Sequence, residues 1–236
     1  MATSNYITNV AIVGAGGNCG SFITKALLKT GKHKITAITW IDSQNKLPAG
    51  STIRKWLLAK PPRSLYEYAL AKPANFGIDF TNRTVTLFDD GETKISTSTL
   101  PQVGRAVSAL LSLPIKPEGA DKEACLESLK NKVVYVNSFT VSQKDILESA
   151  LRVTSTKAVE QTIEKEPVKE RYSSGIKEIQ EGKPLGFATM TARVFYPDGC
   201  GDFEHNKGTL NNLLNLPKED IDVATKIAND RSKASN

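Results

Sequence analysis

Residues 9–20 constrain the fold of this chain more than any other stretch, because an apolar run there ends in a series of glycines. Val10 to Val13 are β-branched or small apolar residues, a composition typical of a buried strand in a parallel sheet. From Ser21 onward, apolar residues recur at helical spacing. The stretch therefore predicts a strand, a glycine turn and a helix, which together begin an α/β fold.

The glycines of this turn have the spacing G-x-x-G-x-x-G. Glycine at 14 permits a sharp turn, the lack of a Cβ at 16 and 17 lets a pyrophosphate approach the backbone, and glycine at 20 lets the helix pack close to the strand. The helix N-terminus then faces the anion with unpaired N–H groups. The alternative is a glycine-rich turn that only joins two elements. We interpret the turn as a dinucleotide site formed by Gly14, Gly16, Gly17, Asn18, Cys19 and Gly20.

A second apolar run, residues 34–41, predicts a parallel strand that completes a βαβ unit. At the tip of such a strand an acidic side chain holds the ribose hydroxyls of NAD, whereas a basic side chain accepts the 2′-phosphate of NADP. Asp42 and Lys46 both follow this strand, so the local residues leave the choice open. Trp40 either stacks on adenine or covers the sheet edge. The further predicted cofactor contacts are Trp40, Ser43 and Lys46.

The rest of the chain contains further periodic patterns. Helices are predicted in two pieces of residues 51–72 broken by a double proline, and at residues 101–113, 146–151 and 217–227. Strands are predicted at residues 77–80, 84–88 and 133–136, the last of these buried and parallel. Residues 90–91 predict a hairpin turn, and Thr140 with Gln143 predicts a capping box.

The basic side chains gather near the glycine turn. The chain of 236 residues has a formal net charge of +6, and residues 1–60 hold eight basic side chains against one acidic side chain. A nucleotide with several phosphates would be attracted to this part of the chain. Aromatic residues do not alternate with these charges as they do in a base-stacking surface, so we expect no nucleic-acid partner.

Cysteine usage and hydropathy bear on the compartment. Cys19, Cys125 and Cys200 are odd in number and scattered, which argues against a disulfide framework. No apolar run approaches the ~20 residues of a membrane helix, and the first ten residues lack the pattern of a signal peptide. We therefore expect a soluble, cytoplasmic protein with no membrane partner.

Two groups outside the glycine turn have residue types that carry chemistry. Tyr68 and Lys72 match Y-x-x-x-K, the spacing by which a helix places an ammonium group beside a phenol for proton transfer. Pro73 disfavours helical geometry at Lys72, and we favour a chance match, with the pair kept as catalytic candidates. Residues 198–205 contain Asp, Cys, Glu and His, but their spacing matches no zinc or calcium pattern. We interpret them as a polar surface loop and expect no metal.

Four stretches of the chain together resemble the NmrA-like, isoflavone-reductase-like proteins, which are atypical members of the short-chain dehydrogenase superfamily. They are residues 7–20, 88–94, 101–107 and 133–143. The resemblance implies a Rossmann core that binds NADP(H) at the glycine turn, followed by a smaller substrate-side region. It also implies either reduction of an aromatic or other small secondary metabolite, or a redox-sensing role in which the dinucleotide is bound without turnover.

The chain departs from this family in two places. Trp40 stands where the family usually has an arginine that contacts the 2′-phosphate. In addition, about 35 residues, 42–76, stand where the family has several further βα units. We place no third strand in this segment, because residues 51–70 have a helical pattern, and we therefore predict an internal deletion. A parallel sheet without its inner strands would leave backbone groups and apolar faces without partners.

The predicted fold class is α/β, a Rossmann-like NAD(P)-binding fold with an abbreviated parallel sheet and a smaller helical substrate-side region. We expect one domain over residues 1–236, with its core at 6–58 and 77–152 and the substrate-side region at 153–236. The expected function is NADP(H)-dependent reduction of a small aromatic or secondary-metabolite carbonyl or enone substrate. The alternatives are a non-catalytic dinucleotide-sensing regulator with a protein partner, and a truncated inactive product.

Overall fold

The chain folds into two compact units. The computed structural model describes residues 5–40, 46–56, 66–119 and 122–234. Unit 1 is formed by residues 1–63, 100–136 and 209–217, and unit 2 by residues 64–99, 137–208 and 218–236. These boundaries differ from the expected core at 6–58 and 77–152 followed by 153–236, because each unit is assembled from segments that are distant in the sequence.

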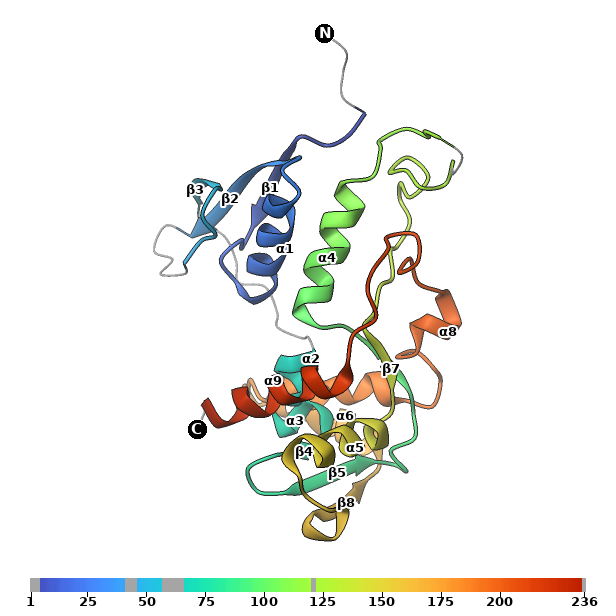
Figure 1. Cartoon of the computed structure of the whole chain (residues 1–236). Coiled ribbons are helices and arrows are strands. Elements are labelled where there is room, and N and C mark those ends of the chain that lie inside the picture. The colour runs from blue at the N-terminus through green and yellow to red at the C-terminus, as the bar shows by residue number, and fades with distance from the viewer. Residues whose placement is uncertain (1–4, 41–45, 57–65, 120–121, 235–236) are drawn as a thin grey trace. The chain divides into compact units, whose positions relative to one another are not determined.

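Unit 1 is built on a parallel sheet. Its elements are β1 (Asn9–Val13), α1 (Asn18–Lys29), β2 (Lys34–Trp40), β3 (Thr52–Trp56) and α4 (Leu100–Leu111). The strands lie in the order β1-β2-β3, and both pairs are parallel. α1 connects β1 to β2 and lies between the sheet and α4 (Figure 1). The predicted βαβ unit and the predicted helix near residues 101–113 are therefore confirmed.

α1 and α4 pack closely because small residues line their contact. A Cβ added at Gly104 of α4 would lie 2.8 Å from the carbonyl oxygen of Phe22 in α1. Ser108 Oγ donates a hydrogen bond to the carbonyl oxygen of Ala26, at 3.2 Å. His33, just before β2, hydrogen-bonds through Nε2 with Ser112 Oγ at 3.2 Å, at the end of α4. These contacts hold α4 against the helix that follows the glycine turn.

The first strand is half-buried on one face and exposed on the other. Asn9, Ala11 and Val13 are exposed, and Val13 retains 59% of its accessible surface. The expectation of a fully buried strand is therefore wrong. α1 packs against β1 and β2, yet the alternate residues of β1 stay exposed.

β3 corrects the expectation of helix after residue 51. Thr52 to Trp56 pair with β2 in parallel, with Thr36 opposite Thr52 and Trp40 opposite Trp56. The open edge of β2 offers a row of N–H and C=O groups, and pairing with that edge satisfies this segment's backbone. The segment therefore does contain a third strand of the sheet. The second predicted helical piece is present as α2 (Tyr66–Leu70).

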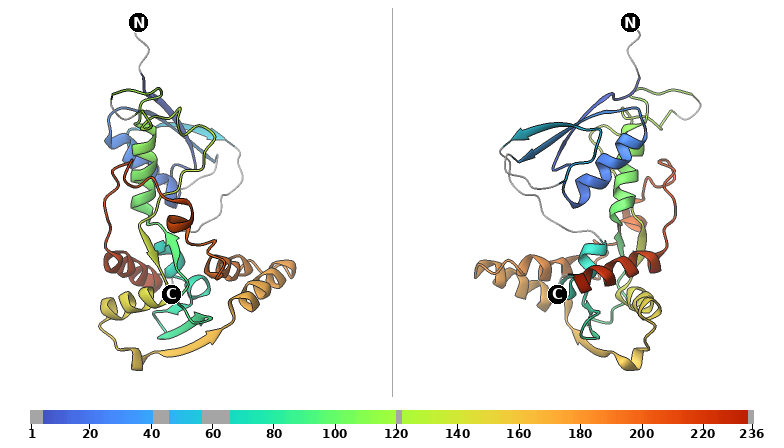
Figure 2. Two further views of the ribbon diagram at one scale, coloured as in Figure 1. Left: turned by 90° about the vertical axis from the view of Figure 1, so that its right-hand side faces the viewer. Right: turned by 60° about the vertical axis from the view of Figure 1, so that its left-hand side comes forward.

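Unit 2 contains the remaining elements. They are α2, α3 (Pro73–Phe76), β4 (Ile78–Asp79), β5 (Thr84–Phe88), β6 (Ile95–Thr97), β7 (Phe139–Val141), α5 (Gln143–Thr154), η1 (Ala158–Glu160), β8 (Thr162–Glu166), α6 (Val168–Gln180), α7 (Gly186–Thr189), η2 (Met190–Phe195), α8 (Phe203–Lys207) and α9 (Ile221–Ala234). The chain runs from β8 directly into α6 (Figure 2). β4, β5 and β8 form one sheet, and β6 with β7 forms another.

An aromatic cluster forms the centre of the core of unit 2. Phe195 packs edge-on against Phe76 and Phe88, with ring centroids 5.7 Å and 5.3 Å away. Tyr66 packs against Phe139 at 5.4 Å, and its side chain is fully buried. Edge-to-face packing of this kind stabilises a core beyond the simple burial of area.

Two strand predictions in this region are wrong. β5 and β6 flank the turn at residues 90–91, but β5 pairs with β4 and β8 whereas β6 pairs with β7, so they do not form a hairpin. Residues 133–136 form no strand, and Val133 keeps 73% of its surface exposed. The strand of that region is β7, which begins at Phe139 and is antiparallel to β6. The strand β8, which is almost entirely exposed, was not predicted at all.

Two helix starts differ from their predictions. The capping box of α5 is formed by Ser142 and Asp145: Ser142 Oγ accepts from the N–H of Asp145, and the carboxylate of Asp145 accepts from the N–H of Ser142. Gln143 is instead a fully buried residue at the start of the helix. The last helix begins at Ile221, later than Pro217. Over the described ranges, no helix is long and apolar enough to cross a membrane.

Candidate functional site

The glycine turn at the end of β1 is shaped by hydrogen bonds within unit 1. Gly14 has a φ of 74°, in the left-handed region that favours glycine. Its N–H donates to the carbonyl oxygen of Ile38 in β2 at 3.0 Å, and its own carbonyl oxygen accepts from the N–H of Gly17 at 2.8 Å. The turn is therefore fixed to the neighbouring strand at the carboxyl end of the sheet, where ligands of open α/β sheets bind.

At two glycines of this turn an added Cβ would come close to the backbone of Gly14. A Cβ added at Gly20 would lie 2.1 Å from the carbonyl oxygen of Gly14, which is closer than any real contact. A Cβ added at Gly17 would lie 3.2 Å from the same oxygen. Gly20 is therefore required for packing of α1 onto the turn, as the sequence predicted. Gly16 lies in the turn and is partly exposed.

The N-terminus of α1 has the features of an anion site. Gly17 is the N-cap and supplies no side-chain hydrogen bond, and the first turn contains no acidic residue. The first N–H groups of a helix have no acceptor within the helix, and they lie at the positive end of its dipole. Asn18 and Cys19 are partly buried there, and burial raises the pKa of the Cys19 thiol. The thiol is therefore uncharged at neutral pH and does not repel an anion.

The residues of the turn thus fit a pyrophosphate, with a bare backbone, an uncapped helix start and no negative side chain in the first turn. The adenosine side is less completely described. Trp40 is the last residue of β2, at the same end of the sheet as the glycine turn, and Ser43 lies outside the described residues. Lys46 is exposed in the segment before β3.

Tyr68 and Lys72 lie in unit 2 and do not share a helix. α2 ends at Leu70, and Lys72 has an extended backbone with φ −124° and ψ 115° as the N-cap of α3. The effect expected from Pro73 is therefore confirmed. The ring of Tyr68 is stacked by the guanidinium of Arg231, 4.0 Å from its centroid. The helical geometry that would place the ammonium group beside the phenol is not formed.

The side chains of the polar loop at residues 198–205 are bound by other protein groups. Asp198 forms an ion pair with Arg193 at 2.8 Å, which lowers the pKa of the Asp198 carboxyl to about 2. Asp202 accepts from His205 at 2.8 Å, and Glu204 accepts from Asn137 at 2.9 Å. In the part of the chain that the structure describes, no three potential metal-ligating side chains form a group.

A cavity in unit 2 was not predicted from the sequence. It has a volume of about 480 Å³ and lies between α5, α9 and the turn after β4. Asn229 and Lys233, one helical turn apart, contribute polar groups from α9. Their spacing is visible in the sequence, but an i,i+4 pair on a helix carries no signal for a cavity, because the other walls come from distant segments.

This chain is similar to known proteins in sequence and in structure. No protein-family model matches the chain. In sequence it is similar to the oxidoreductase aprR of Aspergillus flavus, with 22% identity over 147 residues. The aligned part covers 62% of this chain and 44% of that protein, so the chain spans less than half the length of the relative.

The structural likeness extends over the whole length. The chain is similar to an NADPH-dependent quinone oxidoreductase, QOR2, from Escherichia coli. The TM-score is 0.55 and the identity 14%, over 98% of this chain and 100% of that one. The chain therefore has a Rossmann-like α/β fold, and the predicted fold class is confirmed.

Proposed function

We propose that this chain is an NADP(H)-binding oxidoreductase that reduces a small carbonyl or enone substrate. The observation that carries the proposal is the glycine turn, in which Gly14 adopts a left-handed conformation and Gly20 leaves room for the first turn of α1. The similarity to an oxidoreductase and to an NADPH-dependent quinone oxidoreductase supports the reaction class. A quinone is a conjugated dicarbonyl and falls within the proposed substrate class.

In this proposal the backbone N–H groups at the start of α1 bind the pyrophosphate, and the adenosine lies near Trp40, Ser43 and Lys46. The bound NADPH supplies the hydride. The eight basic side chains among residues 1–60 attract the phosphates. Lys46, which is exposed, is the residue that we propose for the 2′-phosphate and hence for the preference for NADP(H).

The Gly17→Asp variant tests cofactor binding separately from folding. The φ of −77° and ψ of 177° at Gly17 are accessible to any residue, and aspartate is a favourable helix N-cap, which offsets the crowding of an added Cβ 3.2 Å from the carbonyl oxygen of Gly14. The carboxylate would stand where the pyrophosphate binds. We expect a fluorescence titration with NADPH to give an affinity at least tenfold lower, while the thermal midpoint is kept or raised.

The matched control is Gly31→Asp, which adds the same charge beyond the other end of α1. Nothing lies within 4 Å of an added Cβ there, and the left-handed φ of 67° at Gly31 should lower the thermal midpoint of this variant but not its affinity for NADPH. It should leave the NADPH titration within twofold of the unmodified chain. If NADPH does not bind the unmodified chain, or if Gly17→Asp binds NADPH as well as Gly31→Asp does, the proposal is wrong.

The cofactor preference has its own test. Lys46→Ala should lower the affinity for NADPH several-fold and leave the affinity for NADH unchanged, because only NADPH carries the 2′-phosphate. Lys32→Ala is the control, since Lys32 is also exposed but lies beyond the other end of α1. An equal loss for both cofactors would rule out the assigned role of Lys46.

A second candidate function is a dinucleotide-sensing regulator that binds cofactor and a protein partner without turnover. It is favoured by the geometry of Tyr68 and Lys72, which are not arranged as a proton-transfer pair. The two functions differ in consumption of NADPH with a panel of quinones, enones and ketones. Consumption that Gly17→Asp abolishes would exclude the regulator.

We further propose membership of the NmrA-like proteins with an internal deletion after β2. The exposed face of β1 and the exposed side chain of Ile53 in β3 are apolar surfaces that additional βα units would cover. The transcript across residues 48–64 tests this proposal. An intact longer reading frame there supports a truncated product, which should melt broadly and regain a sharp transition when the missing units are restored.

A further inference from the structure

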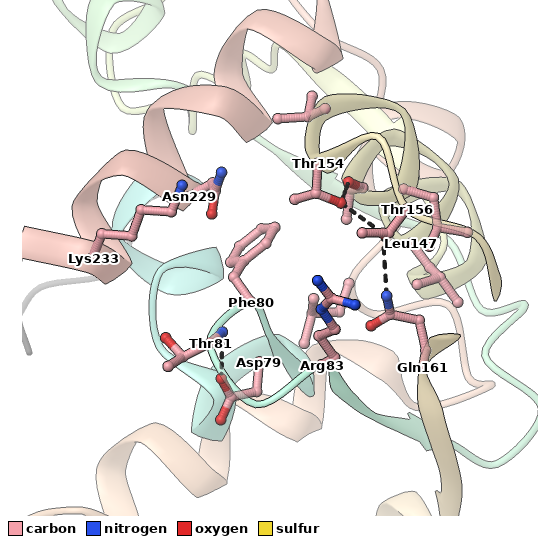
Figure 3. A pocket seen from close by; sticks show the side chains of 14 residues that line it. Asp79, Phe80, Thr81, Arg83, Leu147, Thr154, Thr156, Gln161, Asn229 and Lys233 are labelled. Atoms are coloured by element: carbon pink, nitrogen blue, oxygen red, sulfur yellow. Dashed lines mark hydrogen bonds between the residues drawn. The ribbon is translucent and has the colours of Figure 1, made fainter. Parts of the chain in front are cut away.

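The cavity of unit 2 has walls from three sides. Figure 3 shows Asn229 and Lys233 reaching in from α9, Phe80 and Arg83 from the turn after β4, and Thr154 from the end of α5. Its volume of about 480 Å³ is within the range of cavities that hold small organic ligands. It lies wholly within unit 2, and its shape therefore does not depend on the glycine turn of unit 1.

The charged side chains of the wall formed by the turn after β4 already have hydrogen-bonding or ionic partners. Asp79 accepts from the N–H groups of Thr81 and Asn82, at 2.9 Å and 3.0 Å, and from the side-chain amide of Asn82 at 2.9 Å. Arg83 forms an ion pair with Glu160 at 3.1 Å. The charge of Arg83 is therefore paired with that of Glu160 before any ligand arrives, and both oxygens of Asp79 already accept hydrogen bonds, while Asp79 keeps its negative charge.

On the wall formed by α5, the threonine hydroxyl groups donate their hydrogen bonds to other protein atoms. Thr154 Oγ1 donates to the carbonyl oxygen of Ala150 at 2.7 Å, and it is 2.8 Å from Thr156 Oγ1. Gln161 donates its amide to Thr156 Oγ1 at 3.2 Å. Because Thr154 donates to Ala150, Thr156 donates to Thr154. Neither hydroxyl then has a proton left for a ligand.

The α9 wall is different. Asn229 is 7% exposed, and neither its side-chain amide nor the ammonium group of Lys233 has a hydrogen-bonding or ionic partner within the described residues. Neither polar atom of the Asn229 side chain is fully buried, so the amide is open to solvent and can donate to a ligand that displaces water. Arg83 keeps N–H groups that do not contact Glu160, but the cation without an ionic partner among the described residues of this lining is Lys233, on the α9 side.

The remainder of the lining is apolar. Phe80, Leu147 and Leu151 are among the side chains that face the cavity, and Phe80 and Leu147 also pack against the core of unit 2. A ligand that fits this lining has a compact hydrocarbon or aromatic body on one side and an anionic acceptor on the other.

We propose that this cavity binds a small amphipathic carboxylic acid. The carboxylate accepts hydrogen bonds from Lys233 and Asn229, and the apolar body lies against Phe80, Leu147 and Leu151. The site is independent of the proposed cofactor site, and its occupation requires no dinucleotide.

Isothermal titration with three probes tests this assignment at neutral pH. 4-Phenylbutanoate has the charge and the apolar body, its primary amide lacks the charge, and acetate lacks the body. We expect 4-phenylbutanoate to bind at least fivefold more tightly than either of the other two. Equal binding of the acid and the amide, or of 4-phenylbutanoate and acetate, would overturn the proposal, as would the absence of binding by 4-phenylbutanoate.

Lys233→Ala should weaken binding of 4-phenylbutanoate about tenfold, the scale of a single charge-assisted hydrogen bond, and leave binding of the amide within twofold. Lys226→Ala is the matched control, because Lys226 is an exposed lysine of α9 that does not line the cavity. Lys233 also lies in the last turn of α9, where a cation favours the helix dipole. A Lys233→Ala variant that melts earlier but titrates unchanged would assign the residue to helix stability alone and exclude the site.

The NADPH titration distinguishes this proposal from the proposed function. Lys233→Ala should bind NADPH as the unmodified chain does, and Gly17→Asp should bind 4-phenylbutanoate as the unmodified chain does. Loss of both ligands in either variant would indicate a folding defect; Lys233→Arg, which keeps the cation and the long side chain, should then retain acid binding. Failure of Lys233→Arg to bind the acid, in a protein that still melts cooperatively, would overturn the proposal.

Discussion

A Cβ atom at Gly20 would lie 2.1 Å from the carbonyl oxygen of Gly14, so the first turn of α1 and the glycine turn are in contact without any side chain between them. Gly20→Ala should lower the free energy of unfolding of unit 1 by roughly 1–3 kcal/mol, the usual cost of overpacking. Alanine is the better helix former by about 1 kcal/mol, but the clash is with backbone and cannot be relieved by a side-chain rotation.

Urea unfolding followed by tryptophan fluorescence measures this effect, because both tryptophans of the chain, Trp40 and Trp56, are in unit 1. Gly17→Ala is the comparison, since its Cβ would lie 3.2 Å from the same oxygen, and we expect a change below about 1 kcal/mol. Equal stability of the Gly20→Ala variant and the unmodified chain would contradict the described contact.

Gln143 bonds three backbone groups of unit 2, at the end of α3 and in β5, through one fully buried side chain. Its Oε1 accepts from the N–H of Phe88 at 2.7 Å, and its Nε2 donates to the carbonyl oxygens of Phe76 and Thr86 at 2.9 Å and 3.0 Å. Gln143→Leu keeps the volume and leaves these groups without a partner. We expect a loss of roughly 2–4 kcal/mol in the free energy of unfolding, measured by circular dichroism in urea. Gln180→Leu, at the exposed end of α6, should change it by less than about 0.5 kcal/mol.

Asp222 makes the stability of unit 2 depend on pH in the acid range. Arg152 holds its carboxylate in a two-pronged contact with both distances at 2.8 Å, Ser149 donates to it at 2.6 Å, and these bonds lower the pKa of Asp222 from 3.8 to about 2. Because the pKa is lower in the folded state, the unfolded chain takes up the proton first. The stabilisation is therefore complete above pH 4 and is lost as the pH falls toward 2.

The free energy of unfolding, measured by urea titration at several pH values, checks this expectation. Asp222→Asn should be less stable than the unmodified chain at pH 5, and the difference should shrink as the pH approaches 2. Arg152→Gln should raise the pKa of Asp222 toward its ordinary value, which carboxyl chemical shifts report directly. A difference that stays constant from pH 5 to pH 2 would show that the contact with Arg152 is not maintained in solution.

Lys72 should have little influence on any reductase activity. It lies outside α2 with an extended backbone, and Tyr68 is stacked against Arg231. We expect Lys72→Ala to change the rate of NADPH oxidation with menadione by less than twofold. A loss of a hundredfold or more, the scale of a missing proton-transfer group, would mean that the two residues come together when substrate binds.

The parts of the fold that were predicted correctly depend on neighbours in the sequence. The strand, turn and helix of residues 9–29 follow from an apolar run, from glycine at a left-handed position and from helical periodicity. The helix near residue 101 and the strand at Thr84–Phe88 follow from the same kind of local pattern. The effect of Pro73 on Lys72 is also local, and it was predicted for the same reason.

The errors have a common physical cause. Thr52–Trp56 became a strand because it pairs with the edge of β2, whereas residues 133–136 pair with no strand in the described part of the chain. The turn at residues 90–91 formed as predicted, yet its flanking strands joined different sheets. The predicted starts of α5 and α9 were wrong by two and four residues, because the N-cap of α5 is Ser142 rather than Thr140 and α9 begins at Ile221 rather than Pro217.

For this protein, the sequence by itself determined the glycine turn, the βαβ unit and the class of fold, because backbone conformation and hydrophobic period are properties of consecutive residues. Only the tertiary structure decided which strands pair, which face of the sheet stays exposed, and that Asn229 and Lys233 share a cavity with Phe80. Strand pairing and burial depend on groups far apart in the chain, and the local sequence of a segment does not specify which distant segment it contacts.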